Sequence, residues 1–424
     1  MENRFQNHDE SILKARTQDL YNTPGDIRSE YFRDYCRILH STAYRRLKHK
    51  TQVFFNVGND HVCTRMEHVH HVESVSHTIA IGLGLNCELT SAIAIGHDLG
   101  HAPFGHHGET ILNSLMKEYM TVEYREKHFG NDPDKLFWHE RNGLRFVDMI
   151  ELLPDHAGIK KNLNLTYAVR DGIISHCGEI DESILKPRED DIDLYKFNTP
   201  GKFAPYTWEG CAVKIADKIA YLGRDIEDAL ILKFISNEGK IELKNLARDF
   251  TGKETLNTTD IMHSLISDIC LESTPDSGLT MSHDKYELLC EIKKYNYKYI
   301  YKNPLFNVFQ NYAKLILESI FKVLYTAYDR EHTISNIRDK YKDIYPKLTD
   351  CFTKWLKTYC VHSLITTNKN DDNSTDVDYL AYLKNEKIYG SLDSKDVYVQ
   401  AIIDFISGMT DAFAIELFNE LITF

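Results

Sequence analysis

Helical spacing of apolar residues along almost the whole chain constrains the fold more than any other feature of this sequence. Apolar residues return every three or four positions, which places them on one face of an α-helix. This spacing predicts helices at residues 27–49, 65–83, 88–97, 109–119, 143–153, 167–176, 208–234, 284–301, 306–328, 334–359 and 397–421. Strand candidates are few: residues 51–57 are the clearest, and they also fit a loop or a short hairpin. We therefore expect an all-α protein.

Composition agrees with a helical globule and disfavours several other classes of protein. The 424 residues include only 10 prolines and 21 glycines, too few for a disordered chain or a β-sandwich. The net charge of −13 argues against a broad nucleic-acid-binding surface, although it leaves a local basic groove open. No apolar run is long enough to span a membrane, and residues 1–10 are too polar for a signal peptide.

The cysteines and the loops add two expectations. Nine cysteines without a C-x-x-C pair are typical of reduced thiols, and we expect a cytoplasmic protein. Residues 178–207, 271–282 and 366–378 are rich in turn-forming or polar residues, so we expect loops there. The last of these is the best candidate for a mobile surface loop.

Histidines are concentrated in one short stretch of the chain. Nine of the 20 fall between residues 61 and 107, where an even spread would place about two. Neutral imidazole is the commonest metal ligand in proteins and the usual acid–base group near neutral pH. The concentration therefore indicates a metal site with proton-transfer chemistry around it.

The pair His97-Asp98 is the centre of this stretch. It stands at the end of a predicted apolar helix and precedes Leu99-Gly100, a typical helix stop. Two neighbouring side chains at the last turn of a helix can converge on one ion that lies beyond the helix end. An isolated pair of this kind is more often a capping Asp beside a core His, so the interpretation depends on further residues.

Two such residues complete a set of metal-binding type. His68 lies on its own predicted helix, one turn after Arg65. Asp217 lies on an apolar-faced predicted helix, where a buried carboxylate is costly unless it is paired or binds a metal. Two imidazoles and two carboxylates suit manganese, iron, cobalt, magnesium or zinc.

These four residues resemble the H…HD…D signature of the HD-domain metal hydrolases. More specifically, the run HDLGHAPFGHHGE (97–109) looks like the second motif of the dGTPase-type dNTP triphosphohydrolases. The run YRRLKHKTQVF (44–54) resembles their N-terminal motif, and KIADKIAYLGRDIEDAL (214–230) resembles their last HD motif. The motifs occur in the family's order over about residues 28–235. The resemblance implies an HD-domain helical core with additional C-terminal helices.

The resemblance also implies a division of labour among the site residues. The ligands of a divalent cation (Mn, Mg, Fe or Co, with zinc also open) would be His68, His97, Asp98 and Asp217. His106 and Glu109 would form an acid–base dyad, and His139 would be a third active-site histidine. The other histidines of the cluster, His101 among them, are expected to support the ligands, cap helices or lie on the surface.

Substrate contacts follow from the same motifs. Arg65 and Lys218 would contact a triphosphate, Tyr221 and Asp225 would contact the deoxyribose, Gln52 would approach the sugar or base, and Arg46 belongs to the N-terminal motif. The sequence departs from the family where Glu140 follows His139 in place of the common Asn, and where Val69-His70-His71-Val72 follows His68. These changes touch no predicted ligand, but they alter the bonding around the ligands.

The implied function is hydrolysis of a dNTP, dGTP-like substrates first, to deoxynucleoside and inorganic triphosphate. Metal-activated water would attack the α-phosphorus, and a histidine would protonate the leaving 5′-oxygen. Two alternatives stay open. One is another HD-domain phosphohydrolase that acts on a 5′-nucleotide, a cyclic dinucleotide or an alarmone. The other is a non-catalytic, nucleic-acid-binding HD protein.

The motifs also suggest how the chain is divided and what it binds. We expect an N-terminal helical segment at residues 1–59 that contributes to the active site, and a catalytic core at residues 60–235. Residues 236–424 would form a C-terminal helical region that packs on the core and takes part in oligomerisation. The expected partners are the dNTP substrate and further copies of the chain, with a nucleotide activator or single-stranded nucleic acid left open and no membrane. The sequence does not fix the base preference, the native metal or the oligomeric number.

Overall fold

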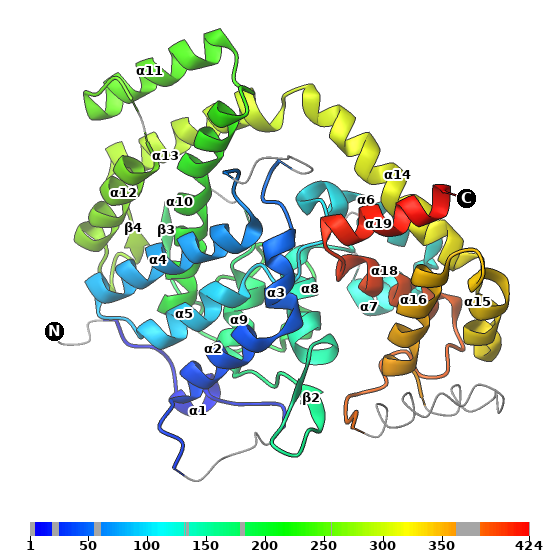
Figure 1. The fold of residues 1–424 in the computed structure, drawn as a ribbon. Coiled ribbons are helices and arrows are strands. Elements are labelled where there is room, and N and C mark those ends of the chain that lie inside the picture. Colours follow the sequence, from blue (N-terminus) through cyan, green and yellow to red (C-terminus); the bar gives the residue numbers. More distant parts are fainter. Residues whose placement is uncertain are drawn as a thin grey trace. The chain divides into compact units, whose positions relative to one another are not determined.

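A computed structural model describes residues 5–18, 25–54, 61–130, 132, 135–178, 183–255, 257–361 and 382–423. Helices dominate this part of the chain and the strands are two or three residues long (Figure 1). The predicted all-α class is therefore confirmed. No helix among the described residues combines the length and the apolar character that crossing a bilayer requires. The loop predicted at residues 366–378 lies outside the described residues.

The chain forms two compact units, and each is assembled from separate stretches of sequence. Unit 1 comprises Met1–Leu39, Thr51–Asp98 and Leu165–Gln310, and unit 2 comprises His40–Lys50, Leu99–Asn164 and Asn311–Phe424. The motifs led us to expect three continuous segments, divided at residues 59 and 235. That division stays a prediction.

Unit 1 is a helical bundle with one minimal sheet. Its elements are most of α2 (Glu30–His40) together with α1 (Glu10–Leu13), α4 (Arg65–Leu83), α5 (Cys87–Gly96), α9 (Tyr167–Ser175), β3 (Ile184–Leu185), the 3₁₀ turn η3 (Leu194–Lys196), α10 (Trp208–Ile231), α11 (Asn237–Thr251), α12 (Thr258–Glu272), β4 (Leu279–Thr280), α13 (His283–Asn296) and the π-helical turn η4 (Tyr297–Tyr301). Strands β3 and β4 are antiparallel, with Ile184 opposite Thr280 and Leu185 opposite Leu279.

The core of unit 1 is the group of helices α4, α5, α9 and α10, which pack on one another (Figure 1). Helices α5 and α9 approach closely because a glycine faces the partner helix on each side. A Cβ at Gly172 would come within 2.6 Å of the Ile93 side chain, and a Cβ at Gly96 within 2.9 Å of Ile173. This close contact fixes the C-terminal ends of both helices relative to each other.

The start of α4 is fixed by a capping box. The Thr64 hydroxyl accepts a hydrogen bond from the Glu67 amide, while the Glu67 carboxylate accepts one from the Thr64 amide. Such a reciprocal cap satisfies two of the amides that a helix start leaves unpaired. At the other end Gly84 takes a left-handed conformation with φ 74° and ends the helix. The first two turns of α4, which carry Arg65 and His68, are thereby held in place.

Unit 2 contains the remaining elements. They are α3 (Thr42–Arg46), η1 (Leu47–His49), α6 (Gly105–Tyr119), α7 (Val122–Phe129), α8 (His139–Arg145), the π-helical turn η2 (Phe146–Ile150), β1 (Leu152–Pro154), β2 (Lys160–Asn162), most of α14 (Leu305–Tyr325), η5 (Arg330–His332), α15 (Thr333–Tyr341), α16 (Pro346–Tyr359), α18 (Lys395–Ser407) and α19 (Asp411–Ile422). Strands β1 and β2 pair antiparallel, with Leu153 opposite Lys161. Helix α18 packs on α6, and α16 packs on α15, α18 and α19.

Several predicted helices are shorter than expected, because capping residues divide them into two. The helix predicted at 27–49 is interrupted at Ser41, whose hydroxyl caps α3. The one predicted at 334–359 is two helices, and the second begins at Pro346. The one predicted at 397–421 is divided where Thr410 caps α19. The one predicted at 143–153 gives way to β1 after Ile150.

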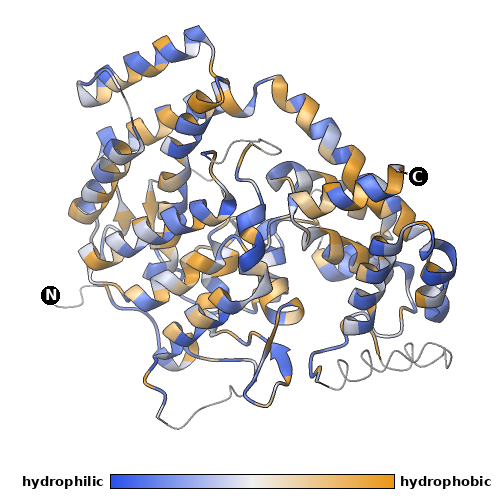
Figure 2. Ribbon diagram, in the orientation of Figure 1, coloured by the Kyte–Doolittle hydropathy of each residue, from blue (hydrophilic) through white to orange (hydrophobic). Residues whose placement is uncertain are grey.

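Four described α-helices were not predicted: α1, α7, α11 and α12. Figure 2 shows hydrophobic and hydrophilic residues alternating around α11, as expected of an amphipathic helix. Of the 51–57 strand candidate, residues 51–54 are described, and Thr51 makes a single antiparallel bridge to Thr64.

Candidate functional site

The four predicted metal ligands converge in unit 1. His68 comes from the first turns of α4, His97 and Asp98 directly follow α5, and Asp217 lies in the middle of α10. His68 Nε2 lies 2.9 Å from Asp217 Oδ1 and 3.8 Å from Asp98 Oδ2. His97 Nε2 lies 3.5 Å from Asp98 Oδ1 and 3.9 Å from Asp217 Oδ1. The structure therefore brings together two imidazoles and two carboxylates from three helices.

The His97 ring is oriented by its own helix. Its Nδ1 donates a hydrogen bond to the Ala94 carbonyl over 2.6 Å, so the acceptor lone pair belongs to Nε2. That Nε2 atom is buried, faces the two carboxylates and has no hydrogen-bond partner among the described residues. A buried imidazole nitrogen that faces acids without a hydrogen bond is what a metal ligand requires.

The spacing of the donor atoms also fits a cation. Donors about 2.1 Å from one ion lie about 3 to 4 Å apart, and the four separations above run from 2.9 to 3.9 Å. Burial alone would raise the pKa of Asp217, but the His68 hydrogen bond and the nearby imidazoles lower it below its usual range. The carboxyl group is therefore ionised and available as a ligand.

Arg65 is fully buried beside this cluster. Its guanidinium donates to Asp98 Oδ2 over 2.7 Å and to the Gln52 carbonyl over 3.2 Å. Arg65 thus holds Asp98 in place and carries positive charge to the edge of the cluster. The Gln52 side-chain oxygen is buried without a hydrogen-bond partner among the described residues. The triphosphate contact predicted for Arg65 and the sugar or base contact predicted for Gln52 stay predictions.

Asp225 lies two turns after Asp217 on α10 and is almost fully buried. Burial raises the pKa of its carboxyl group to about 7, and a hydrogen bond from the Tyr301 hydroxyl limits the rise. Tyr221, one turn before Asp225, is half-buried. The sequence pattern did not predict the hydrogen bond that the Tyr301 hydroxyl donates to Asp225.

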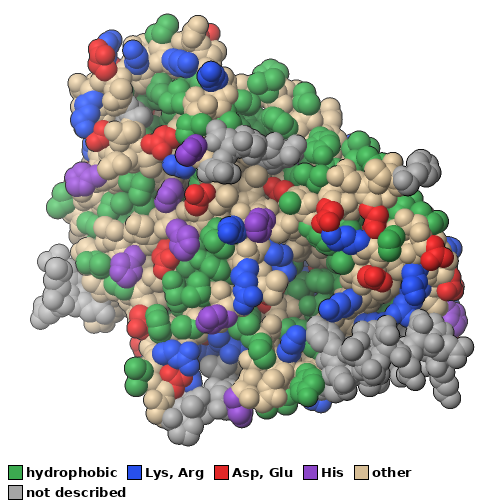
Figure 3. Space-filling model, in the orientation of Figure 1, with side chains coloured by type: hydrophobic (Ala, Val, Ile, Leu, Met, Phe, Trp, Pro, Cys, Tyr) green, Lys and Arg blue, Asp and Glu red, His purple; other side chains and the backbone are tan. Residues whose placement is uncertain are grey.

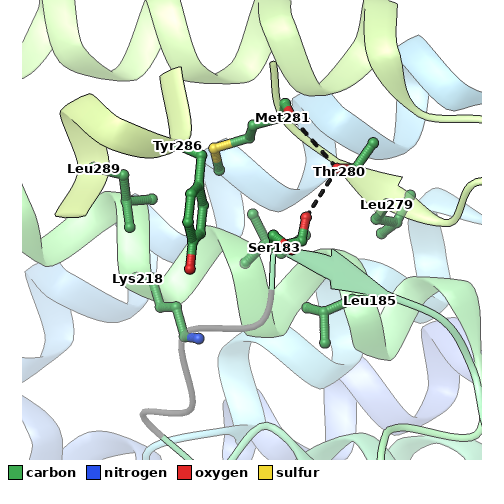
Figure 4. Close-up of a pocket in the computed structure, with 9 residues that line it drawn as sticks. Ser183, Leu185, Lys218, Leu279, Thr280, Met281, Tyr286 and Leu289 are labelled. Atoms are coloured by element: carbon green, nitrogen blue, oxygen red, sulfur yellow. Dashed lines mark hydrogen bonds between the residues drawn. The ribbon is translucent and has the colours of Figure 1, made fainter. Parts of the chain in front are cut away.

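Lys218 lines a small pocket of about 30 Å³ in unit 1 (Figure 4). Figure 4 shows the Tyr286 side chain with its hydroxyl pointing toward Lys218, and Met281 and Leu289 nearby. The pocket is mostly apolar, and the predicted triphosphate contact of Lys218 stays a prediction.

A second cluster forms in unit 2 around Glu109. Its Oε1 atom lies 2.8 Å from His101 Nδ1, 3.0 Å from His139 Nδ1 and 3.6 Å from His106 Nδ1. Helix α6 begins at Gly105, after Phe104 in a left-handed conformation with φ 65°, so His106 and Glu109 share one side of the first turns. The His106 side chain is 72% exposed, whereas that of Glu109 is largely buried.

Electrostatics keep Glu109 ionised despite its burial. Burial raises the pKa of a carboxyl group, but His139, His106 and His101 together hold the pKa of Glu109 well below its usual range. The His101 and His139 rings stack with centroids 3.6 Å apart. Glu140 lies 3.3 Å from His139, and burial raises the pKa of Glu140. One ionised carboxylate therefore lies within 3.6 Å of three imidazoles, and of these three only His106 is largely exposed.

The position of α8, which begins at His139, depends on Gly100. The Asn142 amide donates to the Gly100 carbonyl over 2.7 Å. A Cβ at Gly100 would lie 2.0 Å from the His139 carbonyl oxygen and 2.1 Å from the Gly143 nitrogen. The helix that carries His139 thus packs directly on the backbone of residue 100.

Arg46 was predicted to belong to the substrate site, and this too stays a prediction. Its guanidinium donates to Glu151 over 2.7 Å and lies over the Phe146 ring. It lines a cavity of about 270 Å³ in unit 2 together with Lys160 and Trp355.

Two histidines near the predicted residues were missed. His101 was expected to be a supporting or surface group, and its Nδ1 lies 2.8 Å from Glu109 Oε1. His176 ends α9 beside His97, with ring centroids 5.0 Å apart. The available signal was its position: like His97, it follows an apolar helix. By contrast His70, on the same helix as His68, is exposed, and Figure 3 shows histidines on the visible surface of unit 1.

Comparison with known proteins identifies the family to which this chain belongs. Residues 65–222 match the family described as HD domain. A deoxyguanosinetriphosphate triphosphohydrolase-like protein of Caldanaerobacter subterraneus is 34% identical over 306 residues, which cover 72% of this chain and 75% of that protein. This chain belongs to the HD-domain family of deoxyguanosinetriphosphate triphosphohydrolase-like proteins.

Other members of this deoxyguanosinetriphosphate triphosphohydrolase-like family show how far the likeness extends. The protein of that name from Desulfatibacillum aliphaticivorans is 33% identical over 311 residues, covering 73% of this chain and 77% of its own. That from Bartonella quintana is 30% identical over 420 residues, covering 96% of this chain and 92% of its own. The predicted family resemblance is therefore confirmed, and the HD match contains all four predicted metal ligands.

Proposed function

We propose that this HD phosphohydrolase is a metal-dependent dNTP triphosphohydrolase, with dGTP-like substrates first, that releases deoxynucleoside and inorganic triphosphate. The observation that carries the proposal is the convergence of His68, His97, Asp98 and Asp217, with His97 Nε2 buried and aimed at the two acids. The family names of the relatives support the substrate class.

The four converging residues would hold the cation, and their donor types suit manganese, iron, cobalt, magnesium or zinc. A divalent cation held there would lower the pKa of a water molecule enough to supply a nucleophile at neutral pH. The chain's own contribution is orientation. The Ala94 carbonyl fixes the His97 ring, and Arg65 fixes the Asp98 carboxylate. These contacts remove the need to reorganise the ligands when substrate binds.

Substrate charge sets the next requirement. A nucleoside triphosphate brings about four negative charges, which need cationic partners in addition to a metal ion. In the proposal, Arg65 and Lys218 serve this purpose in unit 1. The buried Asp225 would bond to the 3′-hydroxyl, and the flat ring of Tyr221 would pack against C2′ and exclude a 2′-hydroxyl.

Protonation of the leaving group is assigned to unit 2. Expulsion of the 5′-oxygen from the α-phosphorus produces an alkoxide, which a positioned imidazole can protonate. His106 is the exposed member of the Glu109 cluster, so we assign it the role of general acid that protonates the 5′-oxygen. Buried Glu109 would stabilise the charged form of its imidazole.

The test is product analysis by anion-exchange chromatography. Each dNTP is incubated singly, and then all four are mixed, with manganese, magnesium, iron, cobalt or zinc. Intact triphosphate with deoxynucleoside supports the proposal, and turnover only in the mixture would indicate a nucleotide activator. Monophosphate with pyrophosphate, or no turnover under any metal, would contradict it and favour the other HD phosphohydrolases or a binding protein.

A matched pair of variants tests the proton donor. His106→Ala should reduce turnover by about 100-fold or more while dNTP affinity changes little, because general acid catalysis typically contributes 10²–10⁴-fold. His156→Ala, at an exposed residue of the same unit, should keep full turnover. Full turnover in His106→Ala would show that His106 is not the general acid.

A further inference from the structure

We propose that His176 is a fifth protein ligand of the cation site in unit 1. The donor set then becomes three imidazole nitrogens and two carboxylates. The inference rests on the proposed function only in that both require a cation at His68, His97, Asp98 and Asp217. It does not depend on which phosphate ester is cleaved.

The first argument is the matching placement of two histidines by two helices. His97 is the residue that ends α5, and His176 is the residue that ends α9. Because Gly96 and Gly172 allow the two helices to pack closely, their C-terminal ends lie together. The two rings are perpendicular, with centroids 5.0 Å apart.

The second argument is the tautomer. His176 Nδ1 donates to the Ile173 carbonyl over 2.8 Å, as His97 Nδ1 donates to the Ala94 carbonyl over 2.6 Å. In both cases the carbonyl is that of the residue three positions earlier. The carbonyl engages Nδ1, so each ring presents Nε2 as the metal-binding nitrogen. The same hydrogen bond, from Nδ1 to the carbonyl three residues earlier, thus orients both imidazoles.

The third argument is distance and burial. One ring nitrogen of His176 lies within 4.8 Å of the donor atoms of both His97 and Asp217. Ligands on opposite sides of one ion, each about 2.1 Å from it, are about 4 Å apart. The His176 nitrogen is therefore less than 1 Å from ligand spacing to two of the four predicted ligands, His97 and Asp217. His176 is only 5% exposed, so bulk water does not compete for the nitrogen.

The fourth argument concerns what His176 faces. His97 Nε2 and the Asp217 carboxylate both present lone pairs toward the same space. A cation between them and the His176 nitrogen would turn mutual repulsion into attraction. The alternative is a protonated His176 that pairs with Asp217, and the experiment below separates the two.

A third nitrogen donor predicts a particular metal preference. Affinity of nitrogen ligands for divalent ions rises from manganese through iron to cobalt, whereas magnesium prefers oxygen. Loss of His176 should therefore weaken cobalt binding more than magnesium binding. A merely structural histidine would affect both ions equally, through the shape of the site.

The experiment measures metal binding to the full chain rather than turnover. Metal-free protein is titrated with Co²⁺ and Mg²⁺ in a calorimeter, for the natural chain, His176→Ala, His176→Gln and the exposed control His263→Ala. We expect His176→Ala and His176→Gln to weaken Co²⁺ binding by about 10- to 100-fold and Mg²⁺ binding by less than about 3-fold. His176→Gln preserves most of the side-chain volume if the alanine variant does not fold.

A spectroscopic count decides the ligand number. Pulsed electron paramagnetic resonance of Mn²⁺-loaded protein labelled with ¹⁵N-histidine should show three coupled imidazoles in the natural chain and in His263→Ala. His176→Gln should show two. Two imidazoles in both proteins, with unchanged Co²⁺ affinity, would overturn the proposal and leave His176 paired to Asp217. Three imidazoles in a protein that releases no triphosphate would keep this inference while the proposed function fails.

Discussion

Asp225 illustrates how burial of a single carboxyl group links the fold to pH. Its ordinary pKa of 3.8 is raised to about 7 in the folded chain, chiefly because the group is buried. The folded protein therefore holds a proton that the unfolded chain releases above about pH 4. A partly protonated carboxyl group near neutral pH can both donate and accept a hydrogen bond, which suits contact with a hydroxyl group.

This shift predicts a pH dependence of stability with a definite sign. Between pH 4 and pH 7 the folded state binds more protons at Asp225 than the unfolded state, so stability falls as pH rises. Asp225→Asn lacks this titration. The free energy of unfolding of the natural chain, relative to Asp225→Asn, should fall by about 2 kcal/mol between pH 5 and pH 7. Urea unfolding at a series of pH values measures the difference.

Tyr301→Phe provides the companion experiment. It removes the hydroxyl that donates to Asp225, so the pKa of that carboxyl should rise further. The decline in stability should then extend to higher pH than in the natural chain. A difference from Asp225→Asn that stays constant across this pH range would show that the carboxyl group is already ionised in the folded protein.

The candidate site could be predicted from sequence only where motif residues carry the chemistry themselves. His68, His97, Asp98 and Asp217 were named from residue type and order, and the structure brings them together. Tyr301 could not be named in this way, and the signal for His176 was limited to its position after an apolar helix. Their neighbours are set by the packing of α9 on α5 and of η4 on α10, and no local pattern records such packing.

At the scale of elements, periodicity located the helices but not their breaks. Apolar spacing continues through Ser41 and Thr410, where a hydroxyl caps a new helix, so the sequence pattern joins what the caps divide. Pro346 was a readable signal, because proline favours the first turn of a helix. Helix α11, which was not predicted, has few apolar residues, and only three of its residues are buried.

Packing of α8 on the backbone at Gly100 leads to an element-scale prediction. Gly100→Ala would place a methyl group 2.0 Å from the His139 carbonyl, and backbone atoms cannot move aside without shifting α8. We expect a loss of about 3 kcal/mol in the free energy of unfolding. Turnover should fall by about 100-fold even under conditions where the variant is folded, because His139 is displaced. Thermal unfolding and kcat measure the two effects.

A matched glycine in the same unit controls for the substitution itself. A Cβ at Gly408 would meet the Phe146 ring at 3.4 Å, which is ordinary contact. Gly408→Ala should therefore keep stability within about 1 kcal/mol and leave kcat unchanged. Equal behaviour of the two variants would show that α8 can adjust to a side chain at residue 100.

At the scale of the whole molecule, the chain alternates between the two compact units, and each unit is built from three separate stretches of sequence. Residues 40–50 and 99–164 of unit 2 depend on the C-terminal helices for partners of buried polar groups. The Asp411 carboxylate accepts from the Phe104 amide over 2.9 Å, and the Ser407 carbonyl accepts from Lys50 over 3.0 Å. The C-terminal region is therefore part of the framework that supports the Glu109 cluster, although the family match to the HD domain ends at residue 222.

Asp404 is the strongest of these links and allows the independence of the units to be tested. Its buried carboxylate accepts from Arg145 over 2.7 Å, from Tyr389 over 2.8 Å and from Gln400 over 2.7 Å. Asp404→Ala removes the partner of the Arg145 charge, which should cost about 3–5 kcal/mol. Amide exchange measured by mass spectrometry should accelerate in α6, α8 and α18, while α4, α5 and α10 keep their protection. The exposed Asp343→Ala should change neither set. Equal acceleration in all six helices would instead show that the chain unfolds as one cooperative body.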